Sequence, residues 1–168
     1  MNKNIFLIGF MGVGKSTISK ALKEKLQMEC AEMDQMIVEA QGMPISEISE
    51  KHGESYFRDI ESQTLIDLQG ENNLIVSCGG GIVVRPENAE YMRKSGVVVW
   101  LTATPETVYE RVKDSTERPV LNGNMNVEYI RGLMEKRHAL YEAAADVTVS
   151  TYGKTTEEIC NEILSILK

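Results

Sequence analysis

The segment Gly9–Thr17 carries the residue types and the spacing of a phosphate-binding loop. It fits the pattern G-x-x-x-x-G-K-[ST], and the apolar run Ile5–Ile8 before it has the length of a buried strand. Glycines allow such a loop to curl so that backbone N–H groups point at phosphate oxygens, and the helix that follows adds the positive end of its dipole. In this chemistry Lys15 reaches the β- and γ-phosphates and the Ser16 hydroxyl binds Mg²⁺. The segment therefore predicts a site for a nucleoside triphosphate.

Length and composition narrow the class of protein that could carry this loop. The chain has 168 residues, which fits one domain over 1–168, and a net charge of −7, which leaves no broad basic surface for nucleic acid. There is no apolar run of 18 residues, and Met1–Asn4 leads straight into the first expected strand. The three cysteines lie far apart, without a C-x-x-C pair. We therefore expect a cytoplasmic protein that binds neither nucleic acid nor membrane.

Strand-like and helix-like segments alternate along the chain. The alternation, with apolar runs typical of strands covered on both faces, predicts an α/β three-layer P-loop NTPase fold with a five-stranded parallel sheet flanked by helices. Thr104 before Pro105, and Thr155 with Glu158, have the pattern of helix N-termini. Ligands of such sheets bind at the carboxyl ends of the strands. The expected strands are Ile5–Gly9, Ala31–Asp34, Leu74–Cys78, Val97–Leu101 and Val147–Ser150.

Two other strand ends carry residues that could do chemistry. Glu32 and Asp34 lie at the end of the second expected strand, and Gly79–Gly81 follow the third. Three consecutive glycines remove every side chain from that place, so a ligand or another backbone segment can approach closely. A tight strand-to-helix turn is the alternative explanation. Both strand ends should face the phosphate loop.

Three arginines are candidates on weaker grounds. Arg58 lies at the far end of a helical excursion from Asp34, so the two could face one pocket. Arg118 lies in a polar loop with Pro and Gly, and a loop that closes over ATP would exclude water and supply a cation. Arg137 falls on a long expected helix, about 127–145. A lone arginine of this kind is more often a solvated surface charge.

Taken together, these motifs resemble those of the shikimate kinases, a family of small-molecule kinases with a phosphate-binding loop. The resemblance covers essentially the whole chain, in order. It rests on the Gly9–Thr17 loop, Asp34-Gln35, Gly53-Glu54-x-x-Phe57-Arg58-x-x-Glu61, Ser77-x-Gly79-Gly80-Gly81, Arg118-Pro119-x-Leu121 and Arg137-x-x-x-Tyr141.

The resemblance implies Mg²⁺-dependent transfer of a phosphoryl group from ATP to the 3-hydroxyl of shikimate, in the biosynthesis of aromatic amino acids. It implies that Asp34 holds the attacking hydroxyl and accepts its proton. Arg58 and Arg137 would grip the shikimate carboxylate, as the planar fork of arginine suits a carboxylate. The turn of Gly79, Gly80 and Gly81 would contact the substrate through the Gly80 N–H. The substrate-binding segment would span about 32–61, and the protein would be a monomer.

The same resemblance assigns the nucleotide side. Arg118, on a lid of about 112–125, would reach over the phosphates, and Arg111 and the loop around Lys154 would flank the adenine. Mg²⁺ would be held by Ser16 and, through a water molecule, by Glu32. The residues implied for ATP are Gly12, Val13, Gly14, Lys15, Ser16, Thr17, Arg111, Arg118 and Lys154.

Three positions depart from the family pattern. Glu32 stands where Asp-x-Asp is usual, and its extra methylene must bend if it is to assist Mg²⁺. Val120 replaces a leucine in the lid, and Ala139 replaces a proline two residues after Arg137. Alanine continues a helix more easily than proline. Two alternatives stay open: a kinase for another polyol acid such as gluconate, and a catalytically silent nucleotide-binding module.

Overall fold

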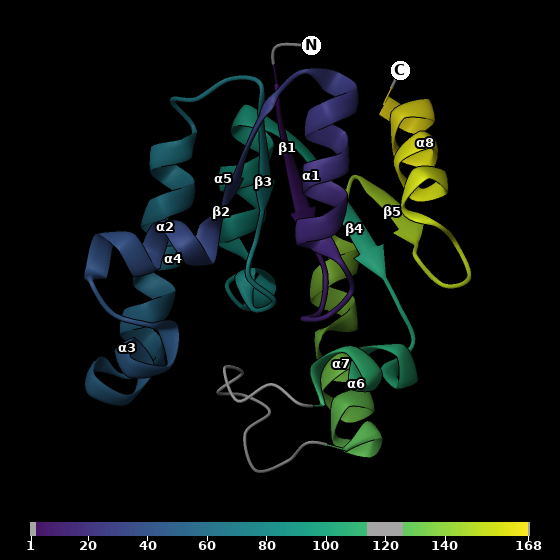
Figure 1. The fold of residues 1–168 in the computed structure, drawn as a ribbon. Helices are drawn as coiled ribbons and strands as arrows, with labels where there is room; N and C mark the ends of the chain where they lie inside the picture. The colour runs from purple at the N-terminus through teal and green to yellow at the C-terminus, as the bar shows by residue number, and fades with distance from the viewer. Residues whose placement is uncertain (1–2, 114–125, 168) are drawn as a thin grey trace.

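The computed structural model describes residues 3–113 and 126–167. Within them lies a five-stranded sheet in the order β2-β3-β1-β4-β5, in which every neighbouring pair is parallel (Figure 1). This confirms the α/β fold predicted from the sequence. The strands are β1 (Asn4–Ile8), β2 (Glu29–Glu32), β3 (Leu74–Ser77), β4 (Gly96–Thr102) and β5 (Val147–Ser150).

Helices connect the strands and begin where the capping residues predict. The Thr104 hydroxyl accepts a hydrogen bond from the Thr107 N–H at 3.1 Å, and Thr155 and Glu158 exchange two such bonds at 3.1 and 3.2 Å. The helices are α1 (Lys15–Leu26), α2 (Met33–Gln41), α3 (Ile45–His52), α4 (Glu54–Leu68), the 3₁₀ helix η1 (Ile82–Val84), α5 (Glu87–Ser95), α6 (Pro105–Val112), α7 (Val127–Ala144) and α8 (Thr156–Leu167). Helix α7 runs without a break through Ala139, as alanine at this position allows.

Alternate residues of β1 divide between two hydrophobic cores. Ile5 and Leu7 pack with α1 and α8 on one face of the sheet, whereas Phe6 and Ile8 pack with α4, α5 and α7 on the other (Figure 1). This follows from the two-residue period of a strand. All five residues of β1 are buried, so the phosphate loop begins from a strand held on both sides.

The second strand ends earlier than the sequence analysis predicted. It spans Glu29–Glu32 rather than 31–34, and α2 begins at Met33. Asp34 therefore lies in the first turn of α2, where the positive end of the helix dipole favours a carboxylate. A third apolar cluster of Ile37, Ile48 and Phe57 joins α2, α3 and α4 beside the sheet.

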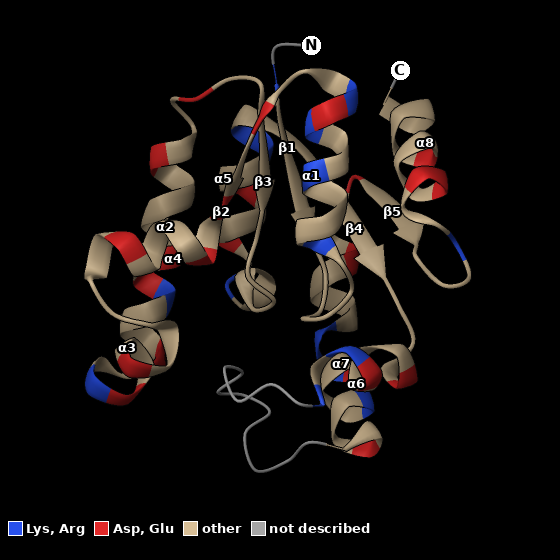
Figure 2. Cartoon of the chain, in the orientation of Figure 1, with Lys and Arg blue, Asp and Glu red and all other residues tan. Residues whose placement is uncertain are grey.

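Charged residues of both signs are interspersed along α1, α4, α6 and α7, whereas α2 and α8 carry only acidic ones (Figure 2). Within the described ranges, no helix combines the length and the apolar character that a membrane crossing requires.

Candidate active site

The phosphate loop between β1 and α1 curls around the Lys15 side chain. The Lys15 Nζ donates hydrogen bonds to the carbonyl oxygens of Gly9 at 2.6 Å and Phe10 at 3.1 Å. Gly14 ends the loop with a φ of 100°, a left-handed conformation that glycine adopts without strain. Helix α1 begins at the next residue, so its N-terminus and the Lys15 ammonium lie at the same place. This arrangement suits a phosphate.

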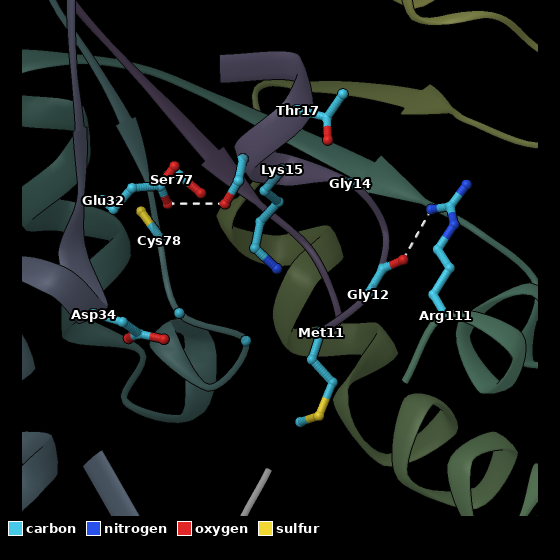
Figure 3. Close-up of a pocket in the computed structure, with 13 residues that line it drawn as sticks. Met11, Gly12, Gly14, Lys15, Thr17, Glu32, Asp34, Ser77, Cys78 and Arg111 are labelled. Atoms are coloured by element: carbon cyan, nitrogen blue, oxygen red, sulfur yellow. Dashed lines mark hydrogen bonds between the residues drawn. The ribbon is translucent and has the colours of Figure 1, made fainter. Parts of the chain in front are cut away.

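A hollow of about 270 Å³ lies beside the loop, at the carboxyl ends of the central strands. Lys15 and Asp34 point into it from two different helices, and Arg111 lies beside Gly12 on the far side (Figure 3). The structure thus brings together three of the segments singled out in the sequence. The hollow is lined by Met11, Gly12, Gly14, Lys15, Ser16, Thr17, Glu32, Asp34, Ser77, Cys78, Gly79, Gly80 and Arg111.

Two oxygen-bearing side chains in this hollow, Ser16 and Glu32, could act as ligands of Mg²⁺. The Ser16 hydroxyl donates a hydrogen bond to Glu32 Oε2 at 3.0 Å. Mg²⁺ prefers oxygen ligands, keeps several of its waters and binds through few protein groups plus phosphates. Ser16 and Glu32 fit this preference, because they place two oxygen atoms side by side next to the phosphate loop.

The glycine turn after β3 allows close approach, as predicted. A Cβ atom at Gly79 would lie 2.9 Å from Asp34 Oδ1 and 3.1 Å from Glu61 Oε2, and one at Gly81 would overlap the Arg58 guanidinium. A Cβ at Gly80 would lie 3.2 Å from the Met11 backbone nitrogen. Side chains of α2 and α4 and the backbone of the phosphate loop therefore both pack against this turn.

Arg58 and Glu61 form a buried ion pair on α4. Arg58 Nη1 contacts Glu61 Oε1 at 2.6 Å, Nη2 contacts Glu54 Oε1 at 3.1 Å, and Arg58 and Glu61 are 7% and 1% exposed. Burial raises the pKa of Glu61, although the charge of Arg58 and its hydrogen bond act to lower that pKa. Burial also opposes the charge of Arg58, but its two acidic partners outweigh burial and raise the pKa of Arg58. The Arg58 Nε is buried without a hydrogen-bond partner among the residues described.

Arg137 approaches the same glycine turn from α7. It is 7% exposed, its Nη1 donates to the Gly80 carbonyl oxygen at 3.4 Å, and its guanidinium lies 5.9 Å from the centre of the Phe10 ring. The Tyr141 hydroxyl donates to the same Gly80 carbonyl oxygen. Burial raises the pKa of Tyr141 to about 12, so its hydroxyl keeps the proton that it donates. Arg137 thus lies on a buried helix face rather than among surface charges.

The predicted adenine residues lie around a second hollow of about 260 Å³, lined in part by Arg111, Lys154, Val13, Gly14 and Thr17. Arg111 Nη1 donates to the Gly12 carbonyl oxygen at 2.8 Å, which holds it against the phosphate loop. Lys154 is paired with Glu162 Oε1 at 2.9 Å. Arg118, and all of the predicted lid of about 112–125 except Val112 and Lys113, lie outside the described residues.

Comparisons with known proteins show the family of this chain. The model of one protein family, described as shikimate kinase, matches residues 11–168. A shikimate kinase from Dehalococcoides mccartyi is 46% identical over 98% of this chain and 93% of its own length. One from Persephonella marina is 45% identical over 99% of both. The chain belongs to the shikimate kinase family. The resemblance noted from the motifs is therefore confirmed.

Solved structures place the fold in the same family. A shikimate kinase from Acinetobacter baumannii in complex with shikimate superposes with a TM-score of 0.93, at 32% identity, over 98% of this chain and 92% of that chain. A gluconokinase from Sinorhizobium meliloti superposes with a TM-score of 0.56 at 16% identity, over 97% and 90% of the two chains, which indicates a shared fold alone. The fold is thus much closer to the shikimate kinase than to the gluconokinase.

The motifs contain two buried residues for which the sequence alone predicted no role. Glu61 pairs with Arg58 from one turn along α4, and Tyr141 contacts Gly80 from one turn beyond Arg137 on α7. The three- and four-residue spacings were a usable signal, because such residues share one face of a helix. That the two faces meet the glycine turn could not be read from spacing.

Proposed function

We propose that this shikimate kinase family member transfers the γ-phosphoryl group of ATP to the 3-hydroxyl of shikimate, yielding ADP and shikimate 3-phosphate. The observation that carries the proposal is the shared hollow: Lys15 and Asp34 point into it from the phosphate loop and from α2. A loop of this kind accounts for a nucleotide, and a facing carboxylate accounts for a hydroxyl acceptor.

On the donor side, the loop N–H groups and Lys15 would bind and neutralise the phosphates. Ser16 would hold Mg²⁺ directly and Glu32 would hold it through a water molecule, and the bound ion would neutralise charge that develops on the phosphate oxygens. Arg111 and Lys154 would flank the adenine in the second hollow. Arg118 would add a cation from the lid. Phosphoryl transfer needs mainly positioning and charge neutralisation, and these residues supply both.

On the acceptor side, Arg58 and Arg137 would bind the shikimate carboxylate. Both guanidinium groups are buried, and Arg58 Nε is a donor that lacks a partner among the described residues. A buried donor of this kind costs free energy until a ligand accepts from it. The segment of about 32–61 would form the wall of the substrate pocket, together with Gly79–Gly81.

Asp34 would orient the attacking hydroxyl. As the hydroxyl oxygen forms its bond to the γ-phosphorus, the bond from that phosphorus to the bridging oxygen of ADP breaks, and the hydroxyl proton passes to the Asp34 carboxylate. Gly79 has no side chain, so the Asp34 carboxylate can lie directly against the glycine turn.

We further propose that the protein acts as a monomer in a reducing cytoplasm. The three cysteines are unpaired, and Cys78 and Cys160 are buried. Equilibrium sedimentation at micromolar concentration tests the monomer, because a molecular mass near twice 18.8 kDa would contradict it.

A coupled assay of ADP release tests the activity. With Mg²⁺ and ATP, addition of shikimate should produce steady ADP release, whereas gluconate at the same concentration should not. Omission of Mg²⁺ should abolish the release. Turnover with gluconate in place of shikimate would favour a different polyol acid, and ATP binding without turnover on either acceptor would indicate a silent module.

A further inference from the structure

The carbonyl of Gly80 receives two hydrogen bonds from one helix. Tyr141 Oη and Arg137 Nη1 both donate to it, the latter at 3.4 Å. The two residues are four apart on α7, so they share one face of that helix. The glycine turn is thereby attached to the helix that carries one of the two buried arginines.

This attachment compensates for what the turn lacks. Three consecutive glycines have no side chains to fix their backbone, and each can adopt a wide range of conformations. The Gly80 carbonyl belongs to the planar peptide that joins Gly80 to Gly81, so a group that holds its oxygen also fixes the direction of the Gly81 N–H. The Arg58 guanidinium packs directly against Gly81. The orientation of one peptide therefore affects both arginines.

Tyr141 is better placed than Arg137 to hold this peptide. Tyr141 is 2% exposed, and its ring stacks on Trp100 of β4, with ring centres 5.6 Å apart and planes 15° apart. Its hydroxyl is therefore fixed by the sheet. Arg137 makes the longer contact, and its guanidinium would have to turn toward a substrate carboxylate. A second donor on Gly80 allows Arg137 to do so while the turn keeps its shape.

We propose that Tyr141 is a positioning residue: its hydroxyl holds the Gly80–Gly81 peptide in the conformation that binds the acceptor, and leaves Arg137 available for the acceptor carboxylate. The kinetic part of this inference rests on the proposed function. The conformational part concerns only the glycine turn and can be tested with the protein alone.

Tyr141→Phe removes the hydroxyl and keeps the ring, and Tyr91→Phe is the matched control. Tyr91 is partly buried, packs against the same core cluster and has no side-chain hydrogen bond among the described residues. We expect Tyr141→Phe to raise KM for shikimate roughly tenfold, since a buried hydrogen bond is lost, with KM for ATP and kcat changed less than about twofold. Tyr91→Phe should change none of them. An equal rise of both KM values, or no rise, would overturn the positioning role.

The second measurement needs no substrate. In protein labelled with ¹⁵N-glycine, the Gly81 amide resonance should move and its hydrogen exchange should accelerate at least tenfold in Tyr141→Phe, with no change in Tyr91→Phe. An unchanged Gly81 amide would refute the inference. If the unmodified protein shows no shikimate-dependent turnover, the proposed function fails, and the amide measurement still decides whether Tyr141 holds the turn.

Discussion

The two sides of the central pocket are built in different ways. The phosphate side consists of nine consecutive residues, Gly9–Thr17, and it presents mainly backbone groups and the side chains of Lys15 and Ser16. The predicted acceptor side combines Asp34 of α2 with a turn of three glycines, and side chains of α4 and α7 contact that turn from outside the lining of the pocket. The phosphate side is thus a local structure, whereas the acceptor side depends on tertiary packing.

This difference implies that changes on the two sides have separable effects. A substitution on the predicted acceptor side should alter turnover or acceptor binding while ATP binding persists, because the phosphate-binding groups come from one continuous segment of the chain. The following predictions test that separation, from the largest expected effect to the smallest.

Asp34→Asn should lower kcat by about 10² to 10⁴, because it removes the group that accepts the hydroxyl proton. ATP affinity, measured by calorimetry, should stay within about twofold. Asp67→Asn is the matched control, since Asp67 is exposed on α4 and accepts a hydrogen bond from Gln63 at 2.9 Å. A near-normal kcat in Asp34→Asn would show that the carboxylate neither orients the hydroxyl nor takes its proton.

Arg137→Lys should raise KM for shikimate roughly 10- to 100-fold, because a lysine cannot make the paired contacts of a guanidinium. KM for ATP should be unaffected. The control is Arg131→Lys, on the same helix, where Arg131 pairs with Glu106 and Glu128 near the surface. Equal effects of the two substitutions would argue against a carboxylate site at Arg137.

Gly79→Ala should raise KM for shikimate by about tenfold, because its methyl group would press on Asp34 and Glu61. Gly132→Ala, within α7, meets nothing within 4 Å and should stabilise the protein by about 0.5–1 kcal/mol. Kinetics and thermal melts of both variants check this contrast. If KM for shikimate were unchanged in Gly79→Ala, the close approach of Asp34 and Glu61 to the turn would not matter for shikimate binding.

Glu61→Gln should change the pH dependence of stability. Burial raises the pKa of Glu61 above its ordinary value of 4.5, so the folded protein holds this proton more tightly than the unfolded chain. Stability from this group is complete below pH 4.5 and is lost as the pH rises through the raised pKa. The Tm of the unmodified protein minus the Tm of Glu61→Gln should therefore fall as the pH rises through this window.

Glu50→Gln, at an exposed position on α3, controls for the loss of one negative charge. If the Tm of the unmodified protein minus that of Glu61→Gln instead rose with pH, Arg58 would lower the pKa of Glu61 more than burial raises it.

The same contrast explains how much the sequence could predict. The phosphate loop, the apolar strand segments and the caps at Thr104 and Thr155 are patterns of neighbouring residues, and the structure agrees with each of them. The predicted end of β2 was wrong by two residues, because Met33 and Asp34 belong to the first turn of α2, where the helix dipole favours the Asp34 carboxylate.

The acceptor side could be predicted only as a set of motif residues. Arg58 and Arg137 each looked like a surface charge until packing placed both of them, buried, beside the same turn. The roles of Glu61 and Tyr141 depend on contacts with a turn that is 18 and 61 residues away from them in the chain, and no local pattern encodes such contacts.

The place of β1 in the middle of the sheet has a consequence for local unfolding. Hydrogen exchange shows that proteins open first at weakly packed edges and last at the central core. Here β2 and β5 form the edges, and the fully buried β1 leads directly into Gly9–Thr17. Openings at either edge leave the phosphate loop attached to the most protected strand. The nucleotide site should therefore persist until the whole sheet unfolds, and its loss should share the midpoint of global unfolding.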